Sequence, residues 1–214
     1  AIFSSNSYSV LLYIRDLQFP QGAYPRWLRV FEVIPEETGE SSGWIGLDAW
    51  EQETGEIEFH AYEYYGATGV ATVKLKVPAA SRNSGYGIAI RYPTDPSLTY
   101  MSINGVGAEF SVSGNPASMA NVNRRLYLHT QFQTEGGFDL AEFGLWKREF
   151  GIPEAIYFST ALKEVIEKGG TALVNPGVTP VSGDFAKIQG YLASCMACHG
   201  VSSAAQVRNN SGVG

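Results

Sequence analysis

Residues 8 to 132 are dominated by short runs in which apolar and polar side chains alternate, separated by Gly, Pro, Asn and Ser. Alternation with a period of two is typical of a strand with one buried face. The pattern predicts nine strands, at Tyr8–Ile14, Arg26–Ile34, Gly43–Trp50, Glu56–Tyr65, Val70–Val77, Gly85–Tyr92, Leu98–Ile103, Val106–Val112 and Arg124–Phe132. Strands at this spacing favour an antiparallel β-sandwich or an open barrel, and the sequence does not choose between them.

The turns between these runs carry their own signals. Asn104-Gly105 stands between two apolar runs and favours a type I′ hairpin, because both residues tolerate a positive φ. The first run, Tyr8–Ile14, is interpreted as an uncovered edge strand that is open to strand addition by a partner.

A helical period replaces the alternation after Gly136-Gly137. Asp139 and Glu142 fit a capping box, and the apolar spacing from Leu140 to Phe150 predicts a first helix. A second helix is predicted from Pro153 to Lys168, and a third after Asp184. The predicted fold class is therefore α+β: a mainly β part followed by two or three C-terminal helices, with domains at 1–135, 136–200 and a polar tail at 201–214.

The third helix ends in Cys195-Met-Ala-Cys198-His199, which contains both cysteines of the chain. Cys-x-x-Cys-His is the spacing for covalent attachment of haem c, because each thiol can add to one vinyl group while the imidazole lies beneath the iron. A redox dithiol, a zinc site and a surface disulfide are the alternatives. The motif predicts one haem c per chain, with His199 as the proximal iron ligand.

In this motif the chain resembles the c-type cytochromes, and the resemblance covers only the motif and its flank. Fifteen residues follow it here, too few for the helices that wrap the haem in small cytochromes c. The distal ligand is therefore expected from the β part or from a neighbouring subunit. The P460 and c′-β cytochromes, β proteins that carry the haem motif late in the chain, are a second resemblance, which implies an open distal site.

The distal candidates are His60 and His129, the only other histidines. Alternation places both on outward strand faces. Tyr62 and Tyr127 are predicted haem contacts beside them, and Arg124 and Arg125 are predicted partners of the propionates.

Three functions follow from these features. The first is haem-mediated assembly or electron transfer, with self-association through the haem-bearing tail that resembles the organisation of extracellular cytochrome filaments, and with a redox partner. The second is a gas-binding or redox haem protein of the P460 kind. The third is a β-sandwich module that binds carbohydrate through its aromatic residues. No hydrolytic motif is present, so the chain is not expected to be an enzyme, a redox enzyme being the alternative.

Composition limits the partners and the location. Fifteen Lys and Arg against 21 Asp and Glu give a net charge of -6, which disfavours nucleic acid. No apolar run reaches the roughly 18 residues of a membrane span. Because the chain begins with Ala1, we expect an exported protein with its signal peptide removed, either extracellular, on the cell surface or in the periplasm.

Overall fold

The computed structural model describes residues 7–36, 44–64, 69–80, 84–108, 110–114, 124–129 and 135–168. Within these ranges, no helix is both long enough and apolar enough to cross a membrane. Residues 1–160 and 161–214 form two separate compact units. The predicted third helix, the Cys195–His199 motif and the polar tail lie outside the described residues, so they and the predicted domain boundaries stay predictions.

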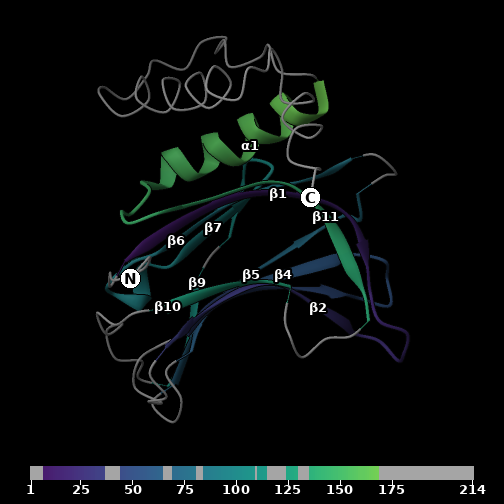
Figure 1. The fold of residues 1–214 in the computed structure, drawn as a ribbon, viewed down its shortest axis with the longest axis horizontal. Coiled ribbons are helices and arrows are strands. Elements are labelled where there is room, and N and C mark those ends of the chain that lie inside the picture. The colour runs from purple at the N-terminus through teal and green to yellow at the C-terminus, as the bar shows by residue number, and fades with distance from the viewer. Residues whose placement is uncertain are drawn as a thin grey trace. The chain divides into compact units, whose positions relative to one another are not determined.

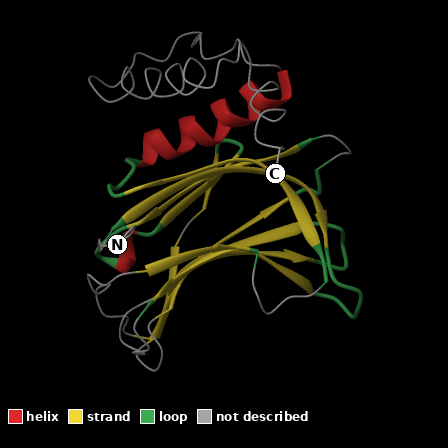
Figure 2. Cartoon of the chain, viewed as in Figure 1, coloured by secondary structure: helices red, strands yellow, loops and turns green. Residues whose placement is uncertain are grey.

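The described strands form two antiparallel sheets that face each other as a sandwich (Figure 1, Figure 2). The five-stranded sheet has the order β11-β1-β6-β7-β8, and the six-stranded sheet has the order β10-β2-β3-β4-β5-β9. The sandwich prediction is confirmed, and the barrel alternative is wrong. The strands are β1 (Tyr8–Gln18), β2 (Arg26–Pro35), β3 (Trp44–Glu51), β4 (Ile57–Tyr64), β5 (Gly69–Val77), β6 (Gly85–Tyr92), β7 (Tyr100–Ile103), β8 (Val106–Ala108), β9 (Phe110–Gly114), β10 (Arg124–Leu128) and β11 (Gly137–Trp146).

The core lies between the sheets and follows the predicted alternation. On β3, Ile45, Leu47 and Ala49 are fully buried, and on β4 Phe59 and Ala61 are as well. A buried hydrogen bond crosses the interior, since the Tyr92 hydroxyl on β6 donates to the Gly46 carbonyl on β3 at 2.6 Å. Because a buried polar group is costly unless it is paired, this bond fixes how the two sheets face each other.

The β7–β8 hairpin has the predicted turn. Asn104 and Gly105 have φ values of 52° and 86°, as a type I′ turn requires. The turn contacts the first half of the helix α1 (Ile152–Lys168), because the Gly105 amide donates to the Ser159 hydroxyl at 2.9 Å. The prediction of a helix from Pro153 to Lys168 is confirmed. The segment Pro96–Leu98, at the start of the seventh predicted strand, forms the short 3-10 helix η3.

The predicted helix from Asp139 to Phe150 is wrong, because residues 137 to 146 form the strand β11. β11 pairs with β1, and the register shifts where Tyr13 faces Glu142 and Ile14 faces Leu140. The extra residue at this bulge changes which side chains face the core. Phe138, Leu140, Phe143 and Leu145 all pack against the core. The three-residue step from Leu140 to Phe143 therefore imitates a helical period.

The edge position predicted for the first strand is also wrong. β1 lies between β11 and β6 and is paired on both sides. Its amide and carbonyl groups are taken by these neighbours, so β1 is not open to strand addition.

Candidate functional site

The outer face of the six-stranded sheet carries a cavity of about 300 Å³, lined by Arg29, Trp44, Asp48, Tyr62 and Tyr64. These side chains come from the adjacent strands β2, β3 and β4. Trp44 and Asp48 alternate along β3 with the buried Ile45 and Leu47, which places them on the face away from the core.

A break in the register of β2 lies directly after Arg29. Arg29 faces Asp48 on β3, but the next paired residue is Phe31, which faces Leu47. The extra residue, Val30, forms a β-bulge. After it, Glu32 faces Gly46 on the same outer side as Arg29. Bulges re-aim side chains in this way, and this one brings a cation and an anion three residues apart onto one face.

The floor of the site is a buried ion cluster. Arg29 donates to Asp48 through Nε at 2.6 Å and through Nη2 at 3.3 Å, and through Nη1 to Glu32. The side chains of Arg29, Asp48 and Glu32 are only 18%, 11% and 2% exposed. A two-point fork between guanidinium and carboxylate gives both charge neutralisation and a fixed geometry. Burial raises the pKa of Asp48, while the hydrogen bond from Arg29 opposes that shift.

Tyr62 lies over Gly46. A Cβ atom at Gly46 would come within 2.3 Å of the Tyr62 hydroxyl oxygen, so the position admits no side chain while Tyr62 keeps this place. The Arg29 guanidinium lies 5.2 Å from the centre of the Tyr62 ring. The Tyr62 hydroxyl is buried and has no hydrogen-bond partner in the described protein. Burial raises the pKa of Tyr62 well above its usual range.

The rim of the cavity is aromatic and open. Trp44 and Tyr64 are 39% and 43% exposed, and their ring centroids lie 5.9 Å apart at 58°. Two adjacent exposed rings offer an apolar surface on which a ligand can pack. The arrangement is thus two exposed rings above a polar, charged floor.

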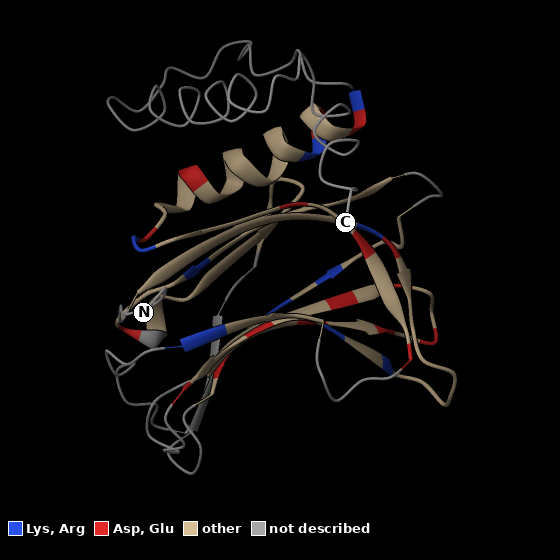
Figure 3. Ribbon diagram, in the orientation of Figure 1, with Lys and Arg blue, Asp and Glu red and all other residues tan. Residues whose placement is uncertain are grey.

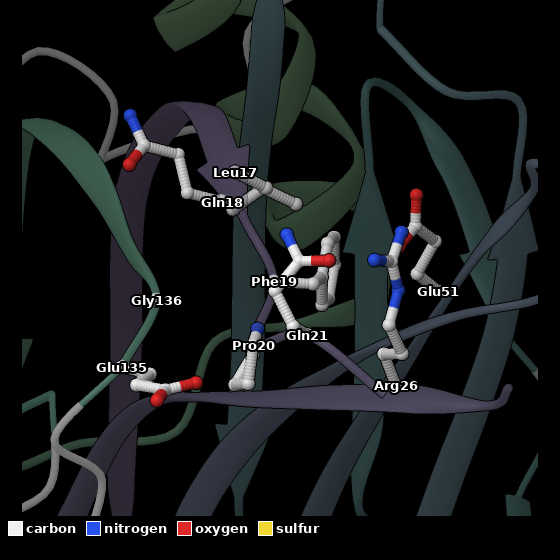
Figure 4. Close-up of a pocket in the computed structure, with 9 residues that line it drawn as sticks. All are labelled: Leu17, Gln18, Phe19, Pro20, Gln21, Arg26, Glu51, Glu135 and Gly136. Carbon is white, nitrogen blue, oxygen red and sulfur yellow. The ribbon is translucent and has the colours of Figure 1, made fainter. Parts of the chain in front are cut away.

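A second, larger cavity of about 470 Å³ lies at another part of the sandwich, where β1 connects to β2 (Figure 4). Arg26 and Glu51 form an ion pair in its wall, and Leu17 and Phe19 contribute apolar surface. A neighbouring cavity of about 240 Å³ shares Leu17, Phe19 and Glu51. The linings of these two cavities include no aromatic side chain as exposed as Trp44 or Tyr64, so we take the cavity on the outer face as the candidate site.

The structure spreads the residues predicted to surround a haem over two regions. His60 is on the outer face as predicted, but its ring is half-buried, stacked on Trp50 at 5.3 Å and hydrogen-bonded to Glu58. Burial lowers the pKa of His60, although Glu58 opposes this. His129 follows β10, near the Phe138 ring. His129 is also next to β2, because its amide donates to the Val30 carbonyl at 2.9 Å. Its ring lies against Phe138, which packs on the core, so of the two distal candidates only His60 has its ring on the outer face.

The other predicted contacts also separate. Tyr62 lines the cavity, whereas Tyr127 on β10 faces Glu32 across the β10–β2 pairing. Arg124 is buried, and Arg125 is exposed and paired with Glu36. Leu128, the last residue of β10, is 47% exposed. Whether any of these residues contacts a haem stays a prediction.

No protein-family model matches the chain, and no curated protein matches its sequence. Several solved structures are similar to it. The CBM40 of the Ruminococcus gnavus IT-sialidase is 10% identical over 72% of this chain and 82% of its own, with a TM-score of 0.41. The leech intramolecular trans-sialidase is 12% identical over 72% of this chain and 23% of its own, with a TM-score of 0.43. The alginate lyase Aly36B is 16% identical over 69% of this chain and 72% of its own, with a TM-score of 0.34. These likenesses are too distant to assign a function.

The classification of the chain as a metal-binding, electron-transferring cytochrome is wrong for the part that the structure describes. Among those residues, no group of three or more His, Cys, Asp or Glu is placed to hold a metal ion. Haem attachment at Cys195, Cys198 and His199 lies outside the described residues and stays a separate prediction.

Proposed function

We propose that the β-sandwich is a carbohydrate-binding module, which holds a saccharide in the cavity between Arg29, Trp44, Asp48, Tyr62 and Tyr64. The observation that carries this proposal is the pair of exposed rings, Trp44 and Tyr64, directly beside the fixed Arg29–Asp48 fork.

A sugar ring presents two kinds of surface, and the cavity offers a counterpart to each. The C–H face of a sugar is apolar and packs on an aromatic ring, which supplies large contact area at a small cost in side-chain entropy. The hydroxyl groups at its edge both donate and accept hydrogen bonds. A small number of well-placed polar groups in an otherwise aromatic pocket is the general pattern of a specific small-molecule site.

Binding fits the site better than hydrolysis does. Glycoside hydrolysis needs two carboxyl groups on either side of the scissile bond, one of them able to donate a proton. Asp48, the carboxylate in the cavity lining, and Glu32 both accept hydrogen bonds from the same guanidinium. They are oriented toward Arg29 and therefore serve as structural anchors of the floor.

A glycan array followed by isothermal titration calorimetry tests this proposal on the full chain. Trp44→Ala and Tyr64→Ala should each weaken binding at least tenfold, because each removes a stacking ring. Leu98→Ala is the control, since Leu98 is 51% exposed and is not among the residues that line the cavity. Absence of binding to every glycan, or equal affinity of the wild type and both ring variants, would overturn the proposal.

A further inference from the structure

The aromatic surface of the six-stranded sheet continues past the cavity. Trp27 on β2 and Trp50 on β3 face each other in the register and stack with ring centroids 6.1 Å apart. His60 on β4 extends the stack, 5.3 Å from Trp50. These three half-buried rings form a second aromatic row across the same three strands that line the cavity.

The two aromatic regions lie on one face of one strand. Trp44 and Trp50 are six residues apart on β3, so their side chains are on the same side, with backbones about 20 Å apart at the usual rise of a strand. Gly46 and Asp48 lie between them. The Arg29 guanidinium joins the regions, since it lies 5.4 Å from the Trp27 ring and 5.2 Å from the Tyr62 ring.

The curvature of the sheet suits an elongated ligand. In Figure 2 the strands of the six-stranded sheet are bowed, and the face away from the other sheet is on the inside of the bend. A concave face with aromatic rings at both ends and polar groups between them matches a chain of several linked sugar rings better than a single ring.

The charges in the floor of the cavity select against an acidic sugar. The single positive charge of Arg29 is opposed by Asp48 and Glu32, both bonded to it. The Arg29 guanidinium already donates to both carboxyl groups, so its charge and its donors are engaged within the protein rather than turned toward a ligand carboxylate. Further out, the Lys76 Nζ atom on β5 lies 3.7 Å from the Glu58 carboxylate, and Lys74 is exposed on the same strand. Basic and acidic residues both occur along the strands of this sheet (Figure 3). An exposed lysine contributes little to affinity at physiological salt.

We infer that the ligand is an uncharged oligosaccharide chain that lies along β3 from Trp44 to Trp50. This inference rests on the proposed function and adds the length and the charge of the ligand to it. Contacts at the Trp44 end act on any saccharide, whereas contacts at the Trp50 end act only on a chain long enough to reach it.

The test measures calorimetric affinities of the full chain for neutral oligosaccharides of two to six rings, from the cello-, malto- and β-1,3-gluco- series. Sialyllactose and alginate oligosaccharides serve as acidic probes. Within the series that binds, we expect affinity to rise at least tenfold from two rings to six. Trp50→Ala should remove that rise and leave the affinity for the shortest ligand within about twofold. Trp50→Phe, which keeps a stacking ring, should retain most of the rise and shows that the site is still folded.

Each result decides between the two proposals. Affinity that is independent of length, or equal losses for short and long ligands in Trp50→Ala, would overturn the inference and leave the proposed function standing. If the acidic probes bind more tightly than every neutral series, the inference is likewise overturned and the proposed function stands. If neither neutral nor acidic saccharides bind, the proposed function itself fails.

Discussion

Arg29 and Asp48 meet across β2 and β3 as a two-point fork, directly before a β-bulge that places Glu32 on the same outer face of the sheet. The same guanidinium also bonds Glu32 and lies against the rings of Trp27 and Tyr62. One side chain thus holds together the acidic floor and both aromatic regions of the face. The predictions below begin from this position.

Replacing Arg29 by Met should destabilise the sandwich by about 3 kcal/mol. The change leaves two largely buried carboxylates without their cation, and breaking a buried pair by removing one partner costs about 3–5 kcal/mol. Urea denaturation measures the loss. Arg29→Lys is the control, because it keeps the charge without the fork and should lose less. If Arg29→Met unfolds with the wild-type free energy, the cluster does not stabilise the fold.

Tyr62→Phe should leave the free energy of unfolding unchanged or raise it by about 1 kcal/mol. The Tyr62 hydroxyl is buried without a protein partner, so removing it removes a desolvation cost of that order. The ring, which the Arg29 contact requires, is kept. Thermal and urea unfolding provide the measurement. A loss of stability greater than 1 kcal/mol would show that this hydroxyl is paired in the folded protein.

The raised pKa of Asp48 predicts a pH dependence of stability with a definite sign. The folded state favours the protonated carboxyl more than the unfolded state does, because burial penalises the charge. The stability that Asp48 contributes is therefore complete at pH values below its pKa in the unfolded state, near the ordinary value of 3.8. It is lost as the pH rises through the raised pKa that Asp48 has in the folded state.

Comparison with Asp48→Asn isolates this effect. Urea denaturation gives the unfolding free energies of the wild type and of Asp48→Asn at a series of pH values from 3 upward. The difference, wild type minus variant, should fall as the pH rises above 3.8. A difference that grows over the same range would mean that ionised Asp48 is favoured by folding, contrary to this account.

Haem attachment is predicted from the sequence alone and is independent of the saccharide site. Protein produced in cells that export it and attach haem c should give a pyridine haemochrome spectrum with one covalent haem per chain. Cys195→Ala with Cys198→Ala should abolish the covalent haem and leave saccharide affinity unchanged. A full-length chain that carries no haem under these conditions contradicts the prediction. Lost saccharide binding in the double variant would mean that the two regions depend on each other.

Much of the sandwich was predictable from alternation, because each strand has one face in the core and its apolar residues recur with a period of two. The same reasoning placed Tyr62 on the outer face. Trp44 and Asp48 alternate with Ile45 and Leu47 in the same way, but nothing else in the sequence distinguishes them from other outward-facing residues.

Two features were missed because a bulge changes the side-chain period without leaving a clear mark in the sequence. At β11 the bulge turned Leu140 and Phe143 onto one face and imitated a helix. At β2 the bulge after Arg29 put Arg29 and Glu32 on one face, although strict alternation would place them on opposite faces. The order of strands in the sheets, which puts β1 between β11 and β6, depends on long-range pairing that no local pattern reports.

The most direct test of the account is the response of the four tryptophan indole N–H signals to a bound saccharide, in nuclear magnetic resonance spectra of the ¹⁵N-labelled chain. Titration with a glycan that binds in the array should shift the Trp44 signal most strongly. The Trp146 signal, from β11 in the other sheet, should not move. A bound saccharide that shifts Trp146 and leaves Trp44 unchanged would place the binding site elsewhere and contradict the account.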